Sequence, residues 1–249
     1  MKRRVRIIPV LLLKNGGLYK TVKFKNANYI GDPINTVKIF NEKEADELVV
    51  LDFTASADKR GIDFKKITEI AGEAFMPMSY GGGIKTFEDA QKIFDAGYEK
   101  VIINSTLFSN LNIIKQIADV YGAQAVVGAI DVKKNLFGKY KVYSHSGTGS
   151  TGHDPVEWAK TLEKNGVGEI IINSIEQDGT WGGYDMTLIE NVANSVKVPV
   201  IACGGAANVE DFKKAVNKGA SAVAAGSMFV YQKKGMGVLI SFPSEKIIL

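Results

Sequence analysis

An internal repeat at half the length of the chain constrains its fold more than any other feature of the sequence. When the 249-residue chain is compared with itself at a shift of 122 positions, Gly82 meets Gly204 and the register continues without a gap. The identical pairs are Pro77/Pro199, Gly82/Gly204, Gly83/Gly205, Glu88/Glu210, Asp89/Asp211, Lys92/Lys214, Gly97/Gly219, Val101/Val223 and Ser105/Ser227. Such a fixed period predicts two copies of one structural unit, about 1–122 and 123–249.

Short apolar runs recur along the whole chain and alternate with segments of helical spacing. The predicted strands are 6–13, 48–52, 76–80, 101–104, 125–131, 170–173, 200–203 and 222–225. Amphipathic segments between them include 86–96 and 209–218. Continuous apolar strands that alternate with helices indicate a buried parallel sheet. Eight such units without an appended domain predict one (β/α)8 TIM barrel over residues 1–249, built from two half-barrels.

Composition and charge exclude several classes of protein. The net charge is only +4 and the basic residues are scattered, which argues against a nucleic-acid partner. The single cysteine, Cys203, excludes an intrachain disulfide and fits a reducing cytoplasm. Since His145 and His153 lie in a polar stretch without zinc spacing, we expect solvated loop histidines and no metal or cofactor. The apolar run after the basic residues 1–6 is too short for a signal peptide or a membrane span.

Each half of the repeat carries a glycine-rich turn and a small polar group at strand ends. The turns are 81–83 after the third strand and 204–205 after the seventh, and the polar groups are 104–106 after the fourth and 226–227 after the eighth. Glycine lets backbone N–H groups approach an anion, and the barrel fold commonly binds phosphate at this face. Simple turns are the alternative interpretation. Two such sites predict a long ligand with a phosphate at each end.

Three aspartates are candidates for acid/base chemistry. Asp131 ends the fifth strand, where barrel enzymes place catalytic groups, although a helix cap or loop ion pair is the alternative. Asp178 follows the sixth strand in a Gln-Asp-Gly-Thr segment and could equally serve the turn. Asp52, at the end of the second strand, is the third candidate.

The repeat also shows where a carboxylate is missing. Aligning residues 11–14 of the first strand with 130–133 of the fifth places Leu12 opposite Asp131. A symmetric acid/base pair would need a carboxylate at Leu12. The sequence therefore predicts an active-site position that cannot exchange protons.

These residues resemble the cyclase subunit of imidazole glycerol phosphate synthase, the HisF family, over 6–229. The segments that carry the resemblance are Arg6-Ile7-Ile8-Pro9, Gly31-Asp32-Pro33, Asp46-Glu47-Leu48-Val49, Leu51-Asp52, Gly81-Gly82-Gly83-Ile84, Ile103-Asn104, Ala129-Ile130-Asp131, Ser174-Ile175-Glu176-Gln177-Asp178-Gly179-Thr180, Gly183-Tyr184-Asp185 and Gly204-Gly205-Ala206. The resemblance implies a reaction in which ammonia from a partner glutaminase enters the barrel. It is added to a bis-phosphorylated ribulosyl aminoimidazole-carboxamide, giving imidazole glycerol phosphate and an aminoimidazole carboxamide ribotide.

The resemblance also implies roles for individual residues. Asp131 would act in acid/base catalysis, and Lys20 would lie on a mobile loop over the site. One phosphate would be held by Gly83, Asn104 and Ser105, and the other held or framed by Asp178, Gly179, Gly205, Gly226 and Ser227.

A charged ring at the opposite mouth of the barrel is the further feature that the resemblance implies. Arg6, Glu47, Lys100 and Glu169 occupy its positions, each just before or at the start of a predicted strand. They would gate the entry of ammonia from a glutaminase (HisH-like) subunit at the N-terminal face. An ordinary charged rim is the alternative, since such side chains commonly pair at a surface.

Two departures from the family separate this chain from a standard cyclase. Leu12 replaces one of the two catalytic aspartates, and the tail 235–243 contains two glycines and Pro243, which disfavour the usual final helix. Both departures resemble a HisF-like branch that accompanies a glutaminase and an N-acetyl-sugar amidotransferase in making acetamidino sugars of surface polysaccharides.

Three functional hypotheses follow. The first is an ammonia-delivering subunit for sugar amidation, and the second is an authentic cyclase in which Asp52, Asp178 or Lys20 replaces the missing aspartate. The third is a non-catalytic scaffold or phosphate-ligand sensor. Trp181 either covers the site or packs beside it, and we interpret Cys203 as a buried strand residue rather than a nucleophile.

Overall fold

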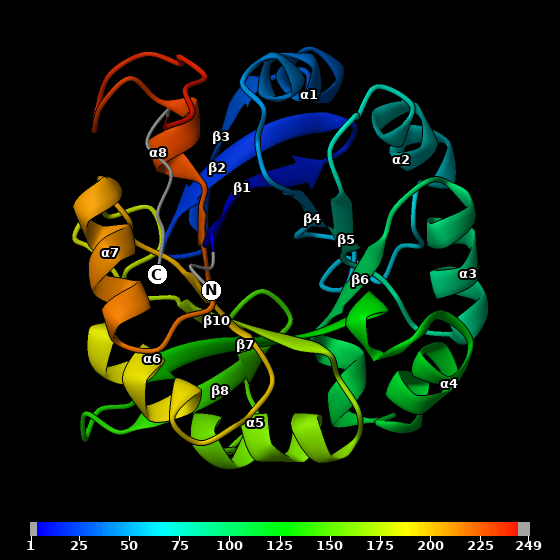
Figure 1. The fold of residues 1–249 in the computed structure, drawn as a ribbon, viewed down its shortest axis with the longest axis vertical. Helices are drawn as coiled ribbons and strands as arrows, with labels where there is room; N and C mark the ends of the chain where they lie inside the picture. The colour runs from blue at the N-terminus through cyan, green and yellow to red at the C-terminus, as the bar shows by residue number, and fades with distance from the viewer. Residues whose placement is uncertain (1–3, 244–249) are drawn as a thin grey trace.

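The computed structural model describes residues 4–243, and these form a closed barrel (Figure 1). Within this part of the chain, eight parallel strands follow the order β10-β11-β12-β1-β4-β5-β6-β7, and β7 pairs with β10 to close the ring. Their bounds are β1 Arg6–Lys14, β4 Leu48–Asp52, β5 Met78–Gly81, β6 Lys100–Ile103, β7 Val126–Lys134, β10 Glu169–Ser174, β11 Val200–Cys203 and β12 Ala222–Ala225. Residues 1–3 of the basic N-terminal segment lie outside the described residues.

The helices surround the barrel on its outer side, as Figure 1 shows. They are α1 Pro33–Glu42, α2 Phe64–Ala71, α3 Phe87–Asp95, α4 Asn112–Tyr121, α5 Pro155–Lys164, α6 Met186–Ala193, α7 Val209–Asn217 and α8 Ser227–Val230, with 3-10 turns at Ser105–Phe108 and Ala123–Ala125. The alternation of strands and helices confirms the predicted (β/α)8 fold. No helix in residues 4–243 is long and apolar enough to cross a membrane.

The predicted strand ends differ slightly from those observed. The third strand was expected at 76–80, but β5 begins at Met78. Pro77 has no N–H group, and its carbonyl oxygen accepts a single hydrogen bond from the Leu48 amide at 2.9 Å before the ladder begins. The first strand is longer than expected because β1 continues to Lys14 in an antiparallel pairing with β2.

Two antiparallel extensions are absent from the sequence interpretation. After β1 the chain turns back as β2 Gly17–Val22 and β3 Lys25–Gly31, and after β7 it turns back as β8 Tyr140–Ser144 and β9 Gly149–Ser150. The first turn is Asn15-Gly16, where both residues have positive φ, which is typical of a hairpin. The extensions stand at the carboxyl ends of β1 and β7, at equivalent places in the two halves.

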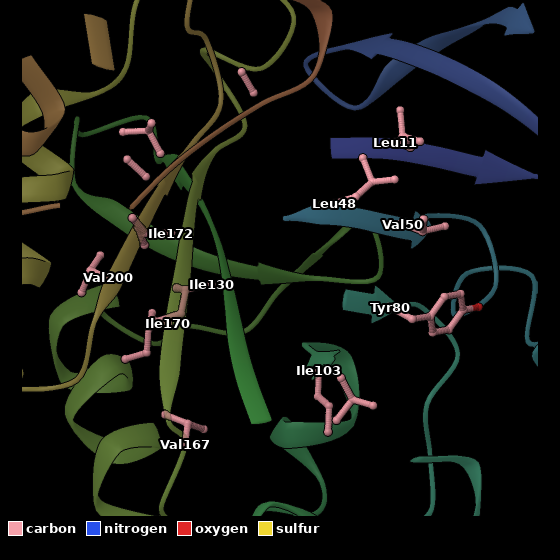
Figure 2. Packing of buried hydrophobic residues seen from close by; sticks show 14 of the residues in the cluster. Leu11, Leu48, Val50, Tyr80, Ile103, Ile130, Val167, Ile170, Ile172 and Val200 are labelled. Carbon is pink, nitrogen blue, oxygen red and sulfur yellow. The ribbon is translucent and has the colours of Figure 1, made fainter. Parts of the chain in front are cut away.

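Buried side chains form two clusters, one on each side of the strands. The inner cluster fills the barrel with Ile8, Val10, Val49, Ile102, Val127, Ile171, Ile201, Ala222 and Ala224. The outer cluster packs between strands and helices, and Figure 2 shows part of it, including Leu11 from β1, Leu48 and Val50 from β4, and Ile170 and Ile172 from β10. Because successive strand residues point to opposite faces, this alternation decides which side chains enter the barrel.

The strand register confirms the half-barrel alignment at Leu12. Leu12 on β1 is paired with Leu51 on β4, and Asp131 on β7 is paired with Asn173 on β10. Leu51 and Asn173 are themselves related by the shift of 122 positions. Leu12 and Asp131 therefore hold equivalent places in the two halves.

The tail follows the sequence expectation. Helix α8 ends at Val230, and residues 231–243 contain no further helix. An isolated bridge between Tyr231 and Val238 folds the tail back on itself.

Candidate active site

A cavity of about 160 Å³ opens at the carboxyl ends of the barrel strands. The structure brings the sequence-predicted residues together there, although they come from both halves of the chain. Its walls include Leu12, Lys20, Asp52, Gly83, Asn104, Ser105, Asp131, Asp178, Gly179, Gly205, Gly226 and Ser227. Their functional roles stay predictions, whereas their shared location is a property of the fold.

Asp131 is held by two amide side chains. Asn104 Nδ2 donates to its Oδ2 at 2.9 Å, and Asn173 Nδ2 donates to its Oδ1 at 3.4 Å. The pKa of Asp131 is raised to about 7, chiefly by burial and to a smaller extent by the charge of Asp178, while the Asn173 hydrogen bond opposes the rise. Because this pKa lies near neutrality, the carboxyl can both accept and donate a proton at physiological pH.

Leu12 lies in the same cavity and packs against the apolar interior of the barrel. Its neighbour in the strand register, Leu51, is also apolar and lines the cavity. One half of the cavity floor therefore carries hydrocarbon where the other half carries Asp131 and Asn173.

The two glycine turns adopt backbone conformations that other residues rarely reach. Gly82 and Gly83 have φ of 112° and 74°, and Gly204 and Gly205 have φ of 90° and 107°. A Cβ atom at Gly82 would collide with the Asp52 carbonyl oxygen, and one at Gly204 with Asn173 Oδ1. The turns therefore need glycine for close packing against neighbouring strand ends, whether or not an anion binds.

Ser105 is linked to the loop that follows β8. Its Oγ accepts a hydrogen bond from the His145 amide at 3.0 Å, and Thr106 Oγ1 donates to the Ile84 carbonyl oxygen. The arrangement places the hydroxyl groups of Ser105 and Thr106 in the same cavity wall as the first glycine turn.

Lys20, on β2, is buried and packs against Gly226 at the end of β12. Its Nζ donates to the Val10 carbonyl oxygen at 2.6 Å, and a Cβ atom at Gly226 would collide with Nζ. Burial lowers the pKa of Lys20 to about 8, and the charge of Asp178 opposes this change. Burial also raises the pKa of Asp178, whose Oδ2 accepts from Thr21 Oγ1 at 3.2 Å. A side chain at Gly226 would therefore displace the lysine amino group from its present position.

Asp52 is engaged in a local ion pair. Its Oδ1 accepts from Arg60 at 2.5 Å and from the amides of Thr54 and Ala55 at 3.3 and 3.2 Å. These contacts hold the loop after β4 over the first glycine turn. The geometry favours a structural role for Asp52 over the acid/base role considered from the sequence.

The four charged residues at the N-terminal mouth form a closed ring of ion pairs. Arg6 contacts Glu47 at 2.5 Å and also contacts Glu169. Lys100 Nζ lies 3.0 Å from Glu47 and 2.9 Å from Glu169. Burial lowers the pKa of Arg6, but Glu169 and Glu47 more than offset this and the pKa is raised overall. Acid and base alternate around the ring, as a paired arrangement of partly buried charges requires.

Several cavity residues have environments that the sequence did not specify. Trp181 lines the cavity, and its backbone has a positive φ of 63°. Cys203 also lines the cavity, where burial raises its thiol pKa to about 12 and makes it a poor nucleophile.

His145 and His153 are both exposed, although the ring of His153 stacks on that of Trp158 with centroids 4.7 Å apart. No cluster of potential metal ligands occurs among the described residues.

Asn173 and Phe24 are cavity residues that the sequence interpretation missed. Asn173 ends a predicted strand, so a polar residue at that position was the available signal. Phe24 lies in the turn between β2 and β3, and its place over the cavity depends on a hairpin that was not predicted.

The sequence of the chain is similar to those of known proteins. The family model described as "Histidine biosynthesis protein" matches residues 6–235. A Pseudomonas aeruginosa protein, provisionally named imidazole glycerol phosphate synthase subunit hisF2, is 53% identical over 96% of each chain. A Leptospira interrogans protein with a similar provisional HisF name is 46% identical over 97% of this chain and 96% of its own. The imidazole glycerol phosphate synthase subunit HisF of Thermococcus gammatolerans is 42% identical over 97% of this chain and 95% of its own. The chain belongs to the HisF family of imidazole glycerol phosphate synthase subunits.

Proposed function

We propose that this HisF-like subunit conducts ammonia in a cytoplasmic glutamine amidotransferase system. A glutaminase at the N-terminal face releases ammonia, which passes through the barrel toward the cavity. The ammonia then serves the amidation of an N-acetylated sugar in surface polysaccharide biosynthesis, carried out with an N-acetyl-sugar amidotransferase.

Leu12 is the observation that carries the proposal. It occupies the half-barrel equivalent of Asp131 and lies in the same cavity. A leucine cannot transfer a proton, and loss of one acid/base group commonly slows a reaction by about 10²- to 10⁴-fold. The ring of charges is intact at one mouth of the barrel, whereas the acid/base pair at the other mouth has lost one member. This combination fits an ammonia conduit better than a cyclase.

The barrel interior supports passage of a small neutral molecule. Between the ring and the cavity its side chains are hydrocarbon, including Ile8, Val49, Ile171 and Ile201. Such a lining favours neutral ammonia over the ammonium ion, because a charged ion would lose its hydration there. The ion pairs of the ring would need to separate for entry, so glutaminase docking is the natural trigger for opening.

An exposed aromatic residue supports docking of the glutaminase at the ring end. Phe75, in the loop before β5, is 90% exposed. Loops that precede barrel strands lie at the N-terminal face, so Phe75 stands on the same face as Glu47 and Lys100. Aromatic side chains of this kind frequently anchor protein interfaces.

The ligand of the cavity in this proposed function is a phosphorylated small molecule. The groups at Gly83 and Ser105 and those at Gly205 and Ser227 face one cavity from the two halves. Lys20, beside the second group, supplies positive charge when it is protonated.

A cyclase assay of a reversal variant tests the proposal. Purified protein receives excess ammonium and the bis-phosphorylated cyclase substrate, beside a Leu12→Asp variant. We expect no turnover by the natural protein and at least a hundredfold gain in the variant, because the second carboxylate is restored opposite Asp131. Leu51→Asp is the matched control, since it introduces a carboxylate at the neighbouring cavity position and should gain nothing. Robust turnover by the natural protein would refute the conduit hypothesis.

An authentic histidine-pathway cyclase is the second candidate. It is favoured by relatives that bear the cyclase subunit's name at 42% identity and by the neighbouring Asp178 and Lys20, whose shifted pKa values could supply a proton shuttle. Expression in a histidine auxotroph that lacks the cyclase tests this candidate. Growth without histidine would support it, and absence of growth would count against it.

A further inference from the structure

The arm formed by β7 and β8 ends in two fully exposed apolar side chains. Leu136 is 102% exposed and Phe137 is 86% exposed. In Figure 1 the arm extends outward beside α6. Adjacent large apolar residues in open solvent at a strand turn are unusual in a monomeric protein and indicate an interaction surface.

The turn that presents them is locally fixed. The Asn135 amide donates to the Lys139 carbonyl oxygen at 2.9 Å, and Asn135 Oδ1 accepts from the amides of Phe137 and Lys139, each at 3.0 Å. The Gly138 amide donates to the Asn135 carbonyl oxygen at 2.9 Å. The backbone that presents the two side chains is therefore ordered before any partner arrives, which lowers the entropic cost of binding.

Lysines surround the tip without an acidic residue in the same segment. Residues 133–141 read Lys-Lys-Asn-Leu-Phe-Gly-Lys-Tyr-Lys. Lys134 lies at 4.0 Å from Asp185, while Lys133 and Lys139 are exposed. An apolar tip with a basic collar is complementary to an apolar pocket with an acidic rim.

The arm belongs to the face at which the cavity opens. Tyr140 Oη donates to Asp185 Oδ1 at 2.8 Å, so the base of the arm is attached to the start of α6. Helix starts and strand ends share one face of the barrel. The ring of Arg6, Glu47, Lys100 and Glu169 lies at the other end, and the arm is therefore remote from the glutaminase side.

We infer that residues 133–141 are the docking arm for the enzyme that consumes the ammonia, an acidic protein surface with an apolar pocket. The inference rests on the proposed function, in which that enzyme is the N-acetyl-sugar amidotransferase. Ammonia that leaves the cavity into water is protonated and lost, so a conduit requires its acceptor to be seated at the exit face. The arm supplies an anchor there without covering the cavity.

Other charges on this face argue against an anionic bilayer as the occupant. Glu157 in the first turn of α5 and Glu210 in the first turn of α7 are 70% and 63% exposed. Each is paired with a lysine of its own helix, Lys160 at 2.8 Å and Lys213 at 3.9 Å, so a flat anionic surface pressed on this face would meet mixed charges there rather than a uniformly basic surface. A protein that contacts the arm locally avoids them.

A binding measurement with the assembled complex tests the arm. The chain in complex with its glutaminase is titrated with the N-acetyl-sugar amidotransferase, using the natural protein, Leu136→Ser/Phe137→Ser and Lys133→Glu/Lys139→Glu. We expect the dissociation constant to rise at least tenfold in both variants. Val120→Ser, which removes an exposed apolar residue of α4, is the matched control and should change it less than twofold. Stimulation of the glutaminase, which depends on the opposite face, should be equal in the natural protein and the two arm variants.

The outcomes separate this inference from the proposed function. Unchanged affinity in both arm variants, or no binding by the natural protein, would overturn the docking arm. Sedimentation of the natural protein with phosphatidylglycerol vesicles, abolished in the arm variants while amidotransferase affinity is unchanged, would identify a bilayer as the occupant and overturn it as well. Arm-dependent binding together with robust cyclase turnover would refute the conduit function and leave the docking arm standing.

Discussion

Asp131 has a buried carboxyl group with only two amide donors. This environment makes the free energy of unfolding depend on pH. Its pKa is raised to about 7, chiefly by burial. Between its ordinary value and pH 7 the folded state binds more protons than the unfolded state, so this residue's contribution to stability falls as pH rises through that window. Lys20 has the opposite dependence. Because its pKa is lowered to about 8, stability rises with pH above that value until the unfolded-state lysine also loses its proton.

Asp131→Asn should therefore stabilise the protein more at pH 8 than at pH 5. The amide carries no charge to desolvate, and Asn104 can rotate its side-chain amide to offer Oδ1, which has no hydrogen-bond partner in the structure. From the pKa shift we expect the gain in unfolding free energy to grow by roughly 2–3 kcal/mol between the two pH values. Urea unfolding at both pH values measures it. A gain that does not change with pH would show that Asp131 is ionised normally in the folded state.

At the scale of elements, some residues of the internal repeat stabilise the starts of helices and do not line the ligand cavity. Asp89 Oδ2 accepts from the amides of Lys85 and Thr86 at 2.9 and 3.1 Å, and Asp211 Oδ2 accepts from the Ala207 amide at 2.9 Å. These matched aspartates are the third residues of α3 and α7, whose N-caps are Thr86 and Asn208, and they bind amides that precede each helix. The repeat thus conserves the geometry that places each turn at a strand-helix junction.

Asp89→Ala and Asp211→Ala should each lower the free energy of unfolding by about 1–2 kcal/mol. The first substitution leaves the amides of Lys85 and Thr86 without this acceptor, and the second leaves the Ala207 amide without it. Glu88→Ala is the control, because Glu88 is exposed and lies in the same turn, and it should change stability by about 0.5 kcal/mol or less. Thermal or urea unfolding compares the three. Equal effects at Asp89 and Glu88 would mean that only first-turn charge matters.

At the scale of the whole molecule, the ring is only partly symmetric. Glu47 and Glu169 are related by the shift of 122 positions, but the same shift pairs Lys100 with Ala222. The two basic residues, Arg6 and Lys100, therefore come from different strands of the first half and bridge both carboxylates. The ring closes one mouth of the barrel while the cavity opens at the other.

Lys100→Met should alter the transfer of ammonia without altering the chemistry at its destination. In a reconstituted complex with the glutaminase and the amidotransferase, we expect at least a twofold change in amidated product per glutamine hydrolysed, because two ion pairs of the ring are lost. Amidation driven by added ammonium should be unchanged. Lys66→Met, which breaks an exposed pair with Glu69, is the control. An unchanged yield would instead favour the scaffold or sensor hypothesis.

The sequence by itself determined the barrel, the position of Leu12 and the four charges of the ring. Strand period, glycine placement and the repeat are local properties, and the strand order of a closed barrel follows from them. That is why the sequence alone matches Leu12 with Asp131 and assigns Arg6, Glu47, Lys100 and Glu169 to strand starts.

Only the tertiary structure decided which polar groups engage one another. Asp52 contacts Arg60, Lys20 packs on Gly226, and Asn173 holds Asp131. The hairpins that carry Phe24 and Phe137 were also not predicted from the sequence, because short antiparallel extensions lack the long apolar runs of the barrel strands. Contacts between residues far apart in the chain depend on how side chains fill the same space, and no local pattern encodes that.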